Sequence, residues 1–258
     1  PTQWFGFEAS FFGMLQSQSS ITQAPFLDTL NQSTLTIPVI PVTRAGVPTD
    51  KDFVLFDDGM NIKYRGDLQG TDAKLVFSPL TPNVPVLFSP ILGFNYLHYD
   101  NRITITGSDT ATQTNHLIDS NANNNIFGPE LGMRIESSSQ WLTIGFEPKL
   151  TFGINRILNR VITQQIYDPT EANRLIDGTQ TRFSPILDLS THARIRLSEN
   201  LQLTLGYQFM FMTNVSLSEQ NIIWNSPALI TAPTRIGLDM HRRDFWVQGL
   251  NIGLQFQF

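Results

Sequence analysis

The sequence of 258 residues contains no cysteine, few charged side chains and no long hydrophobic run. Without cysteine, a disulfide scaffold, a zinc–thiolate site and a thiol nucleophile are excluded. Charged residues make up 15% of the chain, against about 25% in ordinary soluble domains. No apolar stretch reaches the roughly 18 residues of a membrane helix. A β-barrel remains compatible with these absences, because its membrane strands alternate apolar and polar residues.

Alternating residues mark the expected strands. The segment from Trp246 reads WVQGLNIGLQFQF, in which apolar positions such as Leu250 and Ile252 alternate with glycines and amides. A period of two is typical of a strand with one apolar and one polar face. Most such segments have roughly 10–15 residues, enough to cross a bilayer at a tilt. The seven others lie around residues 5–11, 64–77, 88–96, 127–135, 142–152, 187–195 and 201–211.

The connections between these segments alternate between short and long. The long ones are residues 16–59, 101–124, 158–181 and 215–243. Short turns on one side and long loops on the other are typical of an outer-membrane barrel. The sequence therefore predicts an all-β fold: a single antiparallel up-and-down transmembrane β-barrel domain over residues 1–258, with about eight strands and four long extracellular loops.

The polar faces of the expected strands carry charges of both signs. A small barrel has an interior that side chains can fill, and a buried charge without a partner is costly. A salt-bridge network that plugs the lumen is therefore favoured, and a proton- or ion-conducting path is the alternative. Strand parity assigns to this lumen network Glu8, Asp67, Glu130, Arg134, Glu147, Lys149, Asp188, His192, Arg194 and Arg196.

No catalytic, metal-binding or cofactor-binding residues are expected. A hydrolase needs serine, histidine and an acid within hydrogen-bond reach. No serine lies in a glycine-flanked tight turn, and no strand carries histidine and an acid at a spacing from a nucleophile that would suggest such a site. The histidines also lack the spacing of a metal site. A net charge of −5 argues against a nucleic-acid partner. We therefore expect a protein that is not an enzyme and uses no cofactor.

The ending DFWVQGLNIGLQFQF from Asp244 resembles the closing strand of a planctomycete outer-membrane β-barrel family with no assigned activity. Similar stretches in the same order are WFGFEASFFGM from Trp4, GFNYLHYDNRITIT from Gly93 and RLSENLQLTLGYQFMFMTNV from Arg196. The resemblance implies export to the outer membrane of a Gram-negative-type bacterium. It also implies insertion by the barrel assembly machinery, with Phe258 as the C-terminal signal. Family members carry further strands before the Trp4 stretch, so the full protein is expected to add a signal peptide and a hairpin, giving ten strands.

These observations favour a structural, adhesive or surface-binding role. Outer-membrane lipids and the assembly machinery would be the partners, together with an extracellular ligand held by the long loops. Three alternatives remain open: a narrow pore or transporter, an outer-membrane lipid-modifying enzyme, and a soluble β-sandwich with interaction loops.

Overall fold

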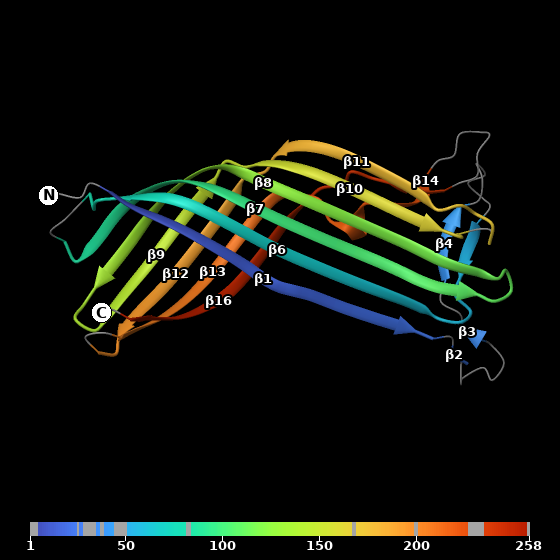
Figure 1. Cartoon of the computed structure of the whole chain (residues 1–258), viewed down its shortest axis with the longest axis horizontal. Coiled ribbons are helices and arrows are strands. Elements are labelled where there is room, and N and C mark those ends of the chain that lie inside the picture. The colour runs from blue at the N-terminus through green and yellow to red at the C-terminus, as the bar shows by residue number, and fades with distance from the viewer. Residues whose placement is uncertain are drawn as a thin grey trace.

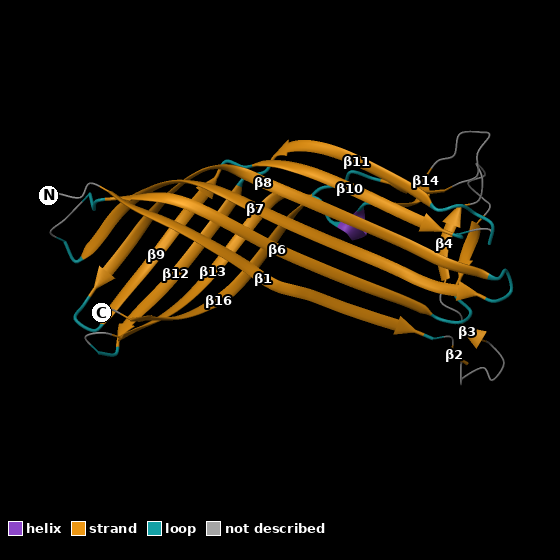
Figure 2. Ribbon diagram, viewed as in Figure 1, coloured by secondary structure: helices purple, strands orange, loops and turns teal. Residues whose placement is uncertain are grey.

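A computed structural model describes residues 5–24, 26–27, 35–36, 39–43, 51–80, 84–166, 169–198, 201–226 and 235–256. In these ranges the chain is almost entirely β-structure, apart from turns and one 3₁₀ segment, η1 (Ser218–Gln220). Strands dominate the ribbon (Figure 2). In the described part, no helix is long and apolar enough to span a membrane.

Eight strands follow one another through a single antiparallel sheet (Figure 1). Each strand pairs with the next one on this path, which is an up-and-down topology. The expected fold class and all eight expected strand segments are thereby confirmed. The strands are β1 (Phe5–Gln23), β6 (Met60–Phe77), β7 (Val86–Asp109), β8 (Thr114–Ser138), β9 (Leu142–Thr151), β12 (Ile186–Arg196), β13 (Leu201–Val215) and β16 (Arg243–Phe256).

Two further strands, β10 (Ile154–Gln164) and β11 (Arg174–Phe183), prolong β9 and β12. Ile154 faces Phe127 of β8, and three residues earlier Thr151 faces Glu130, so the register along β8 is unbroken. Ile154 also faces Phe183, and Thr151 faces Ile186. The pairs β9–β10 and β11–β12 are therefore two long strands, each interrupted at one bend.

The sheet curls into a half-barrel (Figure 1). Among the described residues, β1 and β16 have no strand partner on their outer edges. A cavity of about 190 Å³ lies between these edges, lined by Phe12 and Met14 of β1 and by Val247 and Asn251 of β16.

The half of the sheet nearest the short turns is apolar on its outer face. Phe7 is 68% exposed there and Ile252 is 77% exposed. Lipid-facing residues of membrane barrels are apolar in this way, and aromatic residues border the band. We call this surface the apolar belt, defined by Phe5, Phe7, Phe11, Leu92, Phe94, Tyr96, Phe127, Leu131, Leu142, Ile144, Phe146, Leu150, Phe152, Ile154, Phe183, Leu187, Leu205, Tyr207, Trp246, Leu250, Ile252 and Leu254.

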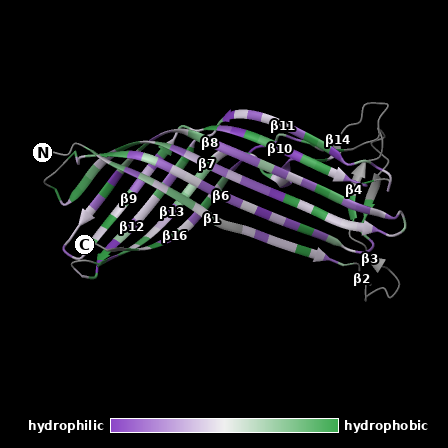
Figure 3. Cartoon of the chain, viewed as in Figure 1, coloured by the Kyte–Doolittle hydropathy of each residue, from purple (hydrophilic) through white to green (hydrophobic). Residues whose placement is uncertain are grey.

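Beyond the belt the same strands continue, and the polarity of the two faces reverses. On β7 the outer face changes from Tyr96 to His98, and on β8 from Phe127 to Asn125. Because Tyr96 faces Phe127 and His98 faces Asn125, the boundary crosses these strands as one line. Hydrophilic segments become frequent on this part of β6, β7 and β8 (Figure 3). We call this part of the sheet the extension.

The inner face of the extension is covered and contains an apolar core. Two small hairpins lie there, β4 (Val39–Thr43) with β5 (Lys51–Leu55), and β14 (Ile222–Ser226) with β15 (Arg235–Leu238). A further short pair is β2 (Phe26–Leu27) with β3 (Leu35–Thr36). The core of the extension joins Val54, Phe56, Ile222 and Ile236 to buried side chains of β7, β8 and β10, namely Ile105, Ile118 and Val161. The extension is thus a two-layered structure outside the belt.

The interpretation of the four long connections as loops is corrected by the structure. Residues 101–124 are the far end of the β7–β8 hairpin, and residues 158–181 contain most of β10 and β11. The ranges 16–59 and 215–243 contain the end of β1 and the small hairpins. Outside the belt the outer face is mostly polar, so a regular row of apolar outward residues no longer marks the strands.

Candidate functional site

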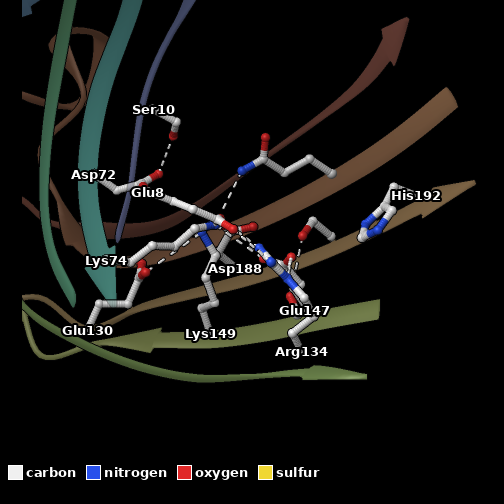
Figure 4. Close-up of polar contacts among 12 residues, drawn as sticks. Glu8, Ser10, Asp72, Lys74, Glu130, Arg134, Glu147, Lys149, Asp188 and His192 are labelled. Atoms are coloured by element: carbon white, nitrogen blue, oxygen red, sulfur yellow. Dashed lines mark hydrogen bonds and ion pairs between the residues drawn. The ribbon is translucent and has the colours of Figure 1, made fainter. Parts of the chain in front are cut away.

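Ionisable side chains gather on the inner face of the belt, where strands from both halves of the sheet converge (Figure 4). Glu130 and Asp188 are 0% and 2% exposed, and Glu147 and Lys149 are each 6% exposed. Their neighbours along each strand point outward to the belt, because successive side chains of a strand alternate faces. The belt interior is therefore charged and largely closed to solvent.

The first cluster joins two cations to two carboxylates. The guanidinium of Arg134 donates two hydrogen bonds to the Glu8 carboxylate, at 2.8 and 2.7 Å, and its Nε donates to Glu147. Lys74 Nζ lies 3.3 Å from Glu147 and 3.5 Å from Glu8. Bidentate arginine–carboxylate pairs are among the stronger charged contacts. The cluster is balanced in charge and ties β1, β6, β8 and β9 together.

The second cluster has more acids than bases. Lys149 Nζ lies 3.0 Å from Asp188 and 3.8 Å from Glu130. Asp72 is also buried and accepts a hydrogen bond of 2.5 Å from the Ser10 hydroxyl. Neutral donors complete the shell: Asn95 and Thr151 each donate to Glu130 at 3.3 Å, and Gln208 donates to Asp188 at 2.9 Å. Lys149 thus contacts two carboxyl groups, and the buried Asp72 carboxylate also interacts with it electrostatically.

A third contact lies nearer the short turns. The side chain of Glu136 accepts a hydrogen bond from Arg194, and its Oε1 lies 3.1 Å from His192 Nε2. His192 reaches Glu136 by lying across Gly145, where an added Cβ would stand 2.2 Å from the imidazole. Glycine at this position leaves the room that the contact requires.

The structure places most of the proposed lumen residues on the inner face. Glu8, Glu130, Arg134, Glu147, Lys149, Asp188, His192 and Arg194 all form the contacts given above. Asp67 is a correction: it lies on the outer face and accepts a hydrogen bond from Gln69 at 3.1 Å. Arg196 is exposed at the end of β12 and forms no ion pair within the described part of the chain. Phe258 lies outside the described residues.

Sequence reasoning missed Asp72, Lys74 and Glu136. Asp72 and Lys74 share strand parity with Leu68, which suggests the lipid face. Leu68 is nevertheless buried on the inner face, only 3% exposed, because it belongs to an apolar core at the boundary with the extension. The useful signal would have been the pairing of Lys74 on β6 with Glu8 on β1. These strands are neighbours in the sheet but far apart in the sequence, so their register is not visible from the sequence.

Above the charged clusters, the chain itself enters the interior. The last three residues of β13 and the six that follow it, residues 213–221, form what we call the inserted segment. Val215 and Ser216 are each 0% exposed, and Ser218 is also fully buried. The segment contacts the inner faces of β7 and β8 through η1.

Side-chain amides hold the backbone of the inserted segment. Asn124 accepts a hydrogen bond from the Ser216 N–H and donates one to the Ser216 carbonyl, both at 2.9 Å. Asn101 accepts from the Ser218 N–H at 2.8 Å, and the Ser120 hydroxyl donates to the Ser218 carbonyl at 2.7 Å. Buried backbone groups must be satisfied, and here strand side chains satisfy them. The interior is thus occupied at two levels, by charged clusters and by backbone.

An apolar belt around a charged interior, crossed by tilted antiparallel strands, is the arrangement of a transmembrane β-barrel. The whole chain, residues 1–258, matches the model of a family described as "Putative beta barrel porin-7 (BBP7)". The chain therefore belongs to the beta barrel porin-7 family. The expected membership of an outer-membrane β-barrel family is confirmed; the match does not concern a planctomycete source. None of the curated proteins compared with the chain matches it.

Proposed function

We propose that this protein is a non-conducting outer-membrane β-barrel that displays its extension at the cell surface for binding. The observation that carries the proposal is the occupied interior. Paired charges fill the belt level, and the inserted segment, fixed by Asn124 and Asn101, fills the level above. A barrel built to conduct would keep this path open.

The orientation follows from the two ends of the sheet. Short turns are typical of the periplasmic side of such barrels, and the longer structures lie outside the cell. The extension would then face the environment. The partners of the protein would be outer-membrane lipids, the barrel assembly machinery that recognises Phe258, and an extracellular ligand. No enzymatic step and no cofactor enters the proposal.

In the part of the chain that the structure describes, the outer edges of β1 and β16 have no strand partner, which adds a requirement. Both run through the belt, where backbone N–H and C=O groups without partners cost several kcal/mol each. In the membrane, each edge therefore needs a strand partner.

A narrow pore is the second candidate, and two observations favour it. The family description includes the word porin, and the acids around Lys149 outnumber the nearby bases. An excess of carboxylates favours cations over anions in a channel. Conductance of the purified protein separates the two candidates.

Surface display is tested by two epitope insertions that differ only in the side on which they lie. One is placed in the β7–β8 turn at residues 110–113, and the other in the β8–β9 turn at residues 139–141. We expect an antibody to label intact cells carrying the first insertion, and to label the second only after the outer membrane is permeabilised. The reverse pattern would place the extension in the periplasm.

A further inference from the structure

The outer face of the extension is hollowed directly beyond the belt. A cavity of about 370 Å³ opens there over β7, β8 and β10. The residues that matter for its chemistry are His98, Asp100, Arg102, Asn121, Asn123 and Arg160. We call this cavity the outer-face hollow.

The height of the outer-face hollow can be read from the strand register. His98, Asp100 and Arg102 are the next three outward positions after Tyr96 at the edge of the belt. With about 3.3 Å per residue and a tilt near 40°, each such step rises about 5 Å along the membrane normal. The hollow therefore lies about 5–15 Å beyond the hydrocarbon edge. A phospholipid headgroup layer is only about 5–8 Å deep, so a lipid would need a larger headgroup to fill it.

Several side chains of the hollow are held in place by hydrogen bonds. Asn121 and Asn123 donate to Asp100 at 2.9 and 3.4 Å. Arg102 donates two hydrogen bonds to Asp119, at 2.6 and 2.7 Å, and these bonds raise the pKa of the Arg102 guanidinium. Positions fixed in this way reduce the ordering cost of binding a ligand.

The hollow has no strong preference for a charged ligand. The carboxylates of Asp100 and Asp119 offset the guanidinium groups of Arg102 and Arg160. No cluster of acids and histidines suited to a metal ion occurs among the described residues. Amides, carboxylates and guanidinium groups together offer both acceptors and donors, and a hydroxyl group uses both. This combination suits the hydroxyl groups of a neutral sugar.

A second cavity connects the hollow to the belt. It measures about 300 Å³, shares His98 with the hollow, and is lined by the belt residues Phe11 and Tyr96. In the wall of this second cavity, Tyr96 Oη donates to Asn125 Oδ1 at 3.0 Å, and His98 Nδ1 lies 3.0 Å from the same oxygen. The surface thus passes from apolar through aromatic to polar along the membrane normal. A glycolipid would match its two ends, with acyl chains at the apolar end and a sugar at the polar end.

We propose that the outer-face hollow binds the neutral sugar headgroup of an outer-leaflet glycolipid, whose acyl chains lie along the belt. The inference rests on the proposed surface display, because sugar headgroups must face the same side as the extension. Glycolipid binding is tested in purified protein, where orientation in cells plays no part. A failure of glycolipid binding is therefore distinguishable from a failure of surface display.

The probe is digalactosyldiacylglycerol, mixed with equal amounts of phosphatidylglycerol and added to protein in a sugar-free detergent such as an alkyl amine oxide. Retained lipid is measured by native mass spectrometry. We expect preferential retention of the glycolipid, reduced at least fivefold in the double variant N121A/R160A. The matched control is Arg156→Ala, which removes an exposed arginine from the same strand and outer face without touching the hollow.

Three outcomes overturn the proposal. Preferential retention of phosphatidylglycerol would indicate an anion site. An equal loss in Arg156→Ala would indicate general attraction to the lipid surface. If free digalactose bound as tightly as the glycolipid, the hollow would recognise a sugar, but the ligand would not need to be a lipid. Circular dichroism of each variant shows that the barrel is intact, so a loss of binding is not a loss of fold.

Discussion

Glu147 joins the two cations of the first lumen cluster, because Arg134 and Lys74 both contact its carboxylate. Removing one partner of a buried ion pair leaves an uncompensated charge, at a cost of about 3 kcal/mol. We expect Glu147→Gln to lower the unfolding free energy by about that amount in urea titrations of the folded barrel in liposomes.

The control for this substitution is Asp177→Asn, which neutralises an exposed carboxylate on β11. No ion-pair partner of Asp177 is found in the described ranges, so its replacement should change stability by less than about 0.5 kcal/mol. Equal effects of the two substitutions would show that the lumen pairs do not contribute to stability.

Adjacent residues of β13 should respond in opposite ways to a new charge. Leu205 points outward and is 41% exposed, whereas Thr204 points inward. Lysine at Leu205 would face hydrocarbon and cost about 2–4 kcal/mol; lysine at Thr204 would face a polar interior and cost less. The same contrast is expected for Ile252 and Asn251 on β16. Liposome refolding titrations of the four variants measure it, and equal losses on both faces would contradict the assigned parity.

Individual side chains were predictable from the sequence where the alternation is regular. Leu205 and Ile252 lie on the outer face as their parity indicates. Prediction failed on β6, where Leu68 is apolar but faces inward: Asp67 was assigned to the lumen, and Asp72, which shares the parity of Leu68, was missed. At this position the interior itself changes from charged to apolar, and the sequence of one strand does not show which face the change affects.

At the scale of elements, the belt crossings were predictable and the extension was not. A membrane crossing needs about 9–11 strand residues, and the regular segments match that length. β7 nevertheless has 24 residues and β8 has 25. Their far ends still alternate, with Ile118 and Ala122 inward and Asn121 and Asn123 outward, but the polarity is that of a soluble sheet. Asparagine-rich sequence is typical of loops, and only the pairing with neighbouring strands reveals it as a strand.

The inserted segment should depend on the asparagine that binds its backbone. Replacing Asn124 by leucine would leave the Ser216 N–H and carbonyl without those partners in a buried site, at a cost of about 1–3 kcal/mol. We expect hydrogen exchange of the amides in residues 215–218 to accelerate by at least tenfold.

Asn123→Leu is the matched control, because Asn123 is the neighbouring residue and points to the outer face. It should leave exchange in residues 215–218 unchanged. If Asn124→Leu also left these amides protected, the packing of Val215 and Leu217 in the apolar core, not the amide contacts, would hold the segment.

For the whole molecule, the reversal of polarity divides the sheet into two structurally different parts. In the belt, apolar side chains face lipid and charges face inward; in the extension, an apolar core lies inside and polar groups face outward. Under the proposed function, the belt anchors the protein in the membrane and the extension offers a binding surface outside it. The charged clusters and the inserted segment occupy the interior that runs from the belt into the extension.

Conduction tests this arrangement for the molecule as a whole. The charged clusters around Arg134 and Lys149 are held by ion pairs, and moving a charge to an unpaired state in a partly dry interior is costly. Above them, the backbone at Ser216 and Ser218 crosses the interior. We therefore expect no sustained current from the purified protein in planar bilayers at neutral pH. The double variant N101A/N124A, which frees the inserted segment, should give brief openings that Asn123→Ala does not. Steady, ohmic and ion-selective current through the unmodified protein would show that the interior is open, and the pore would then be the better account of its function.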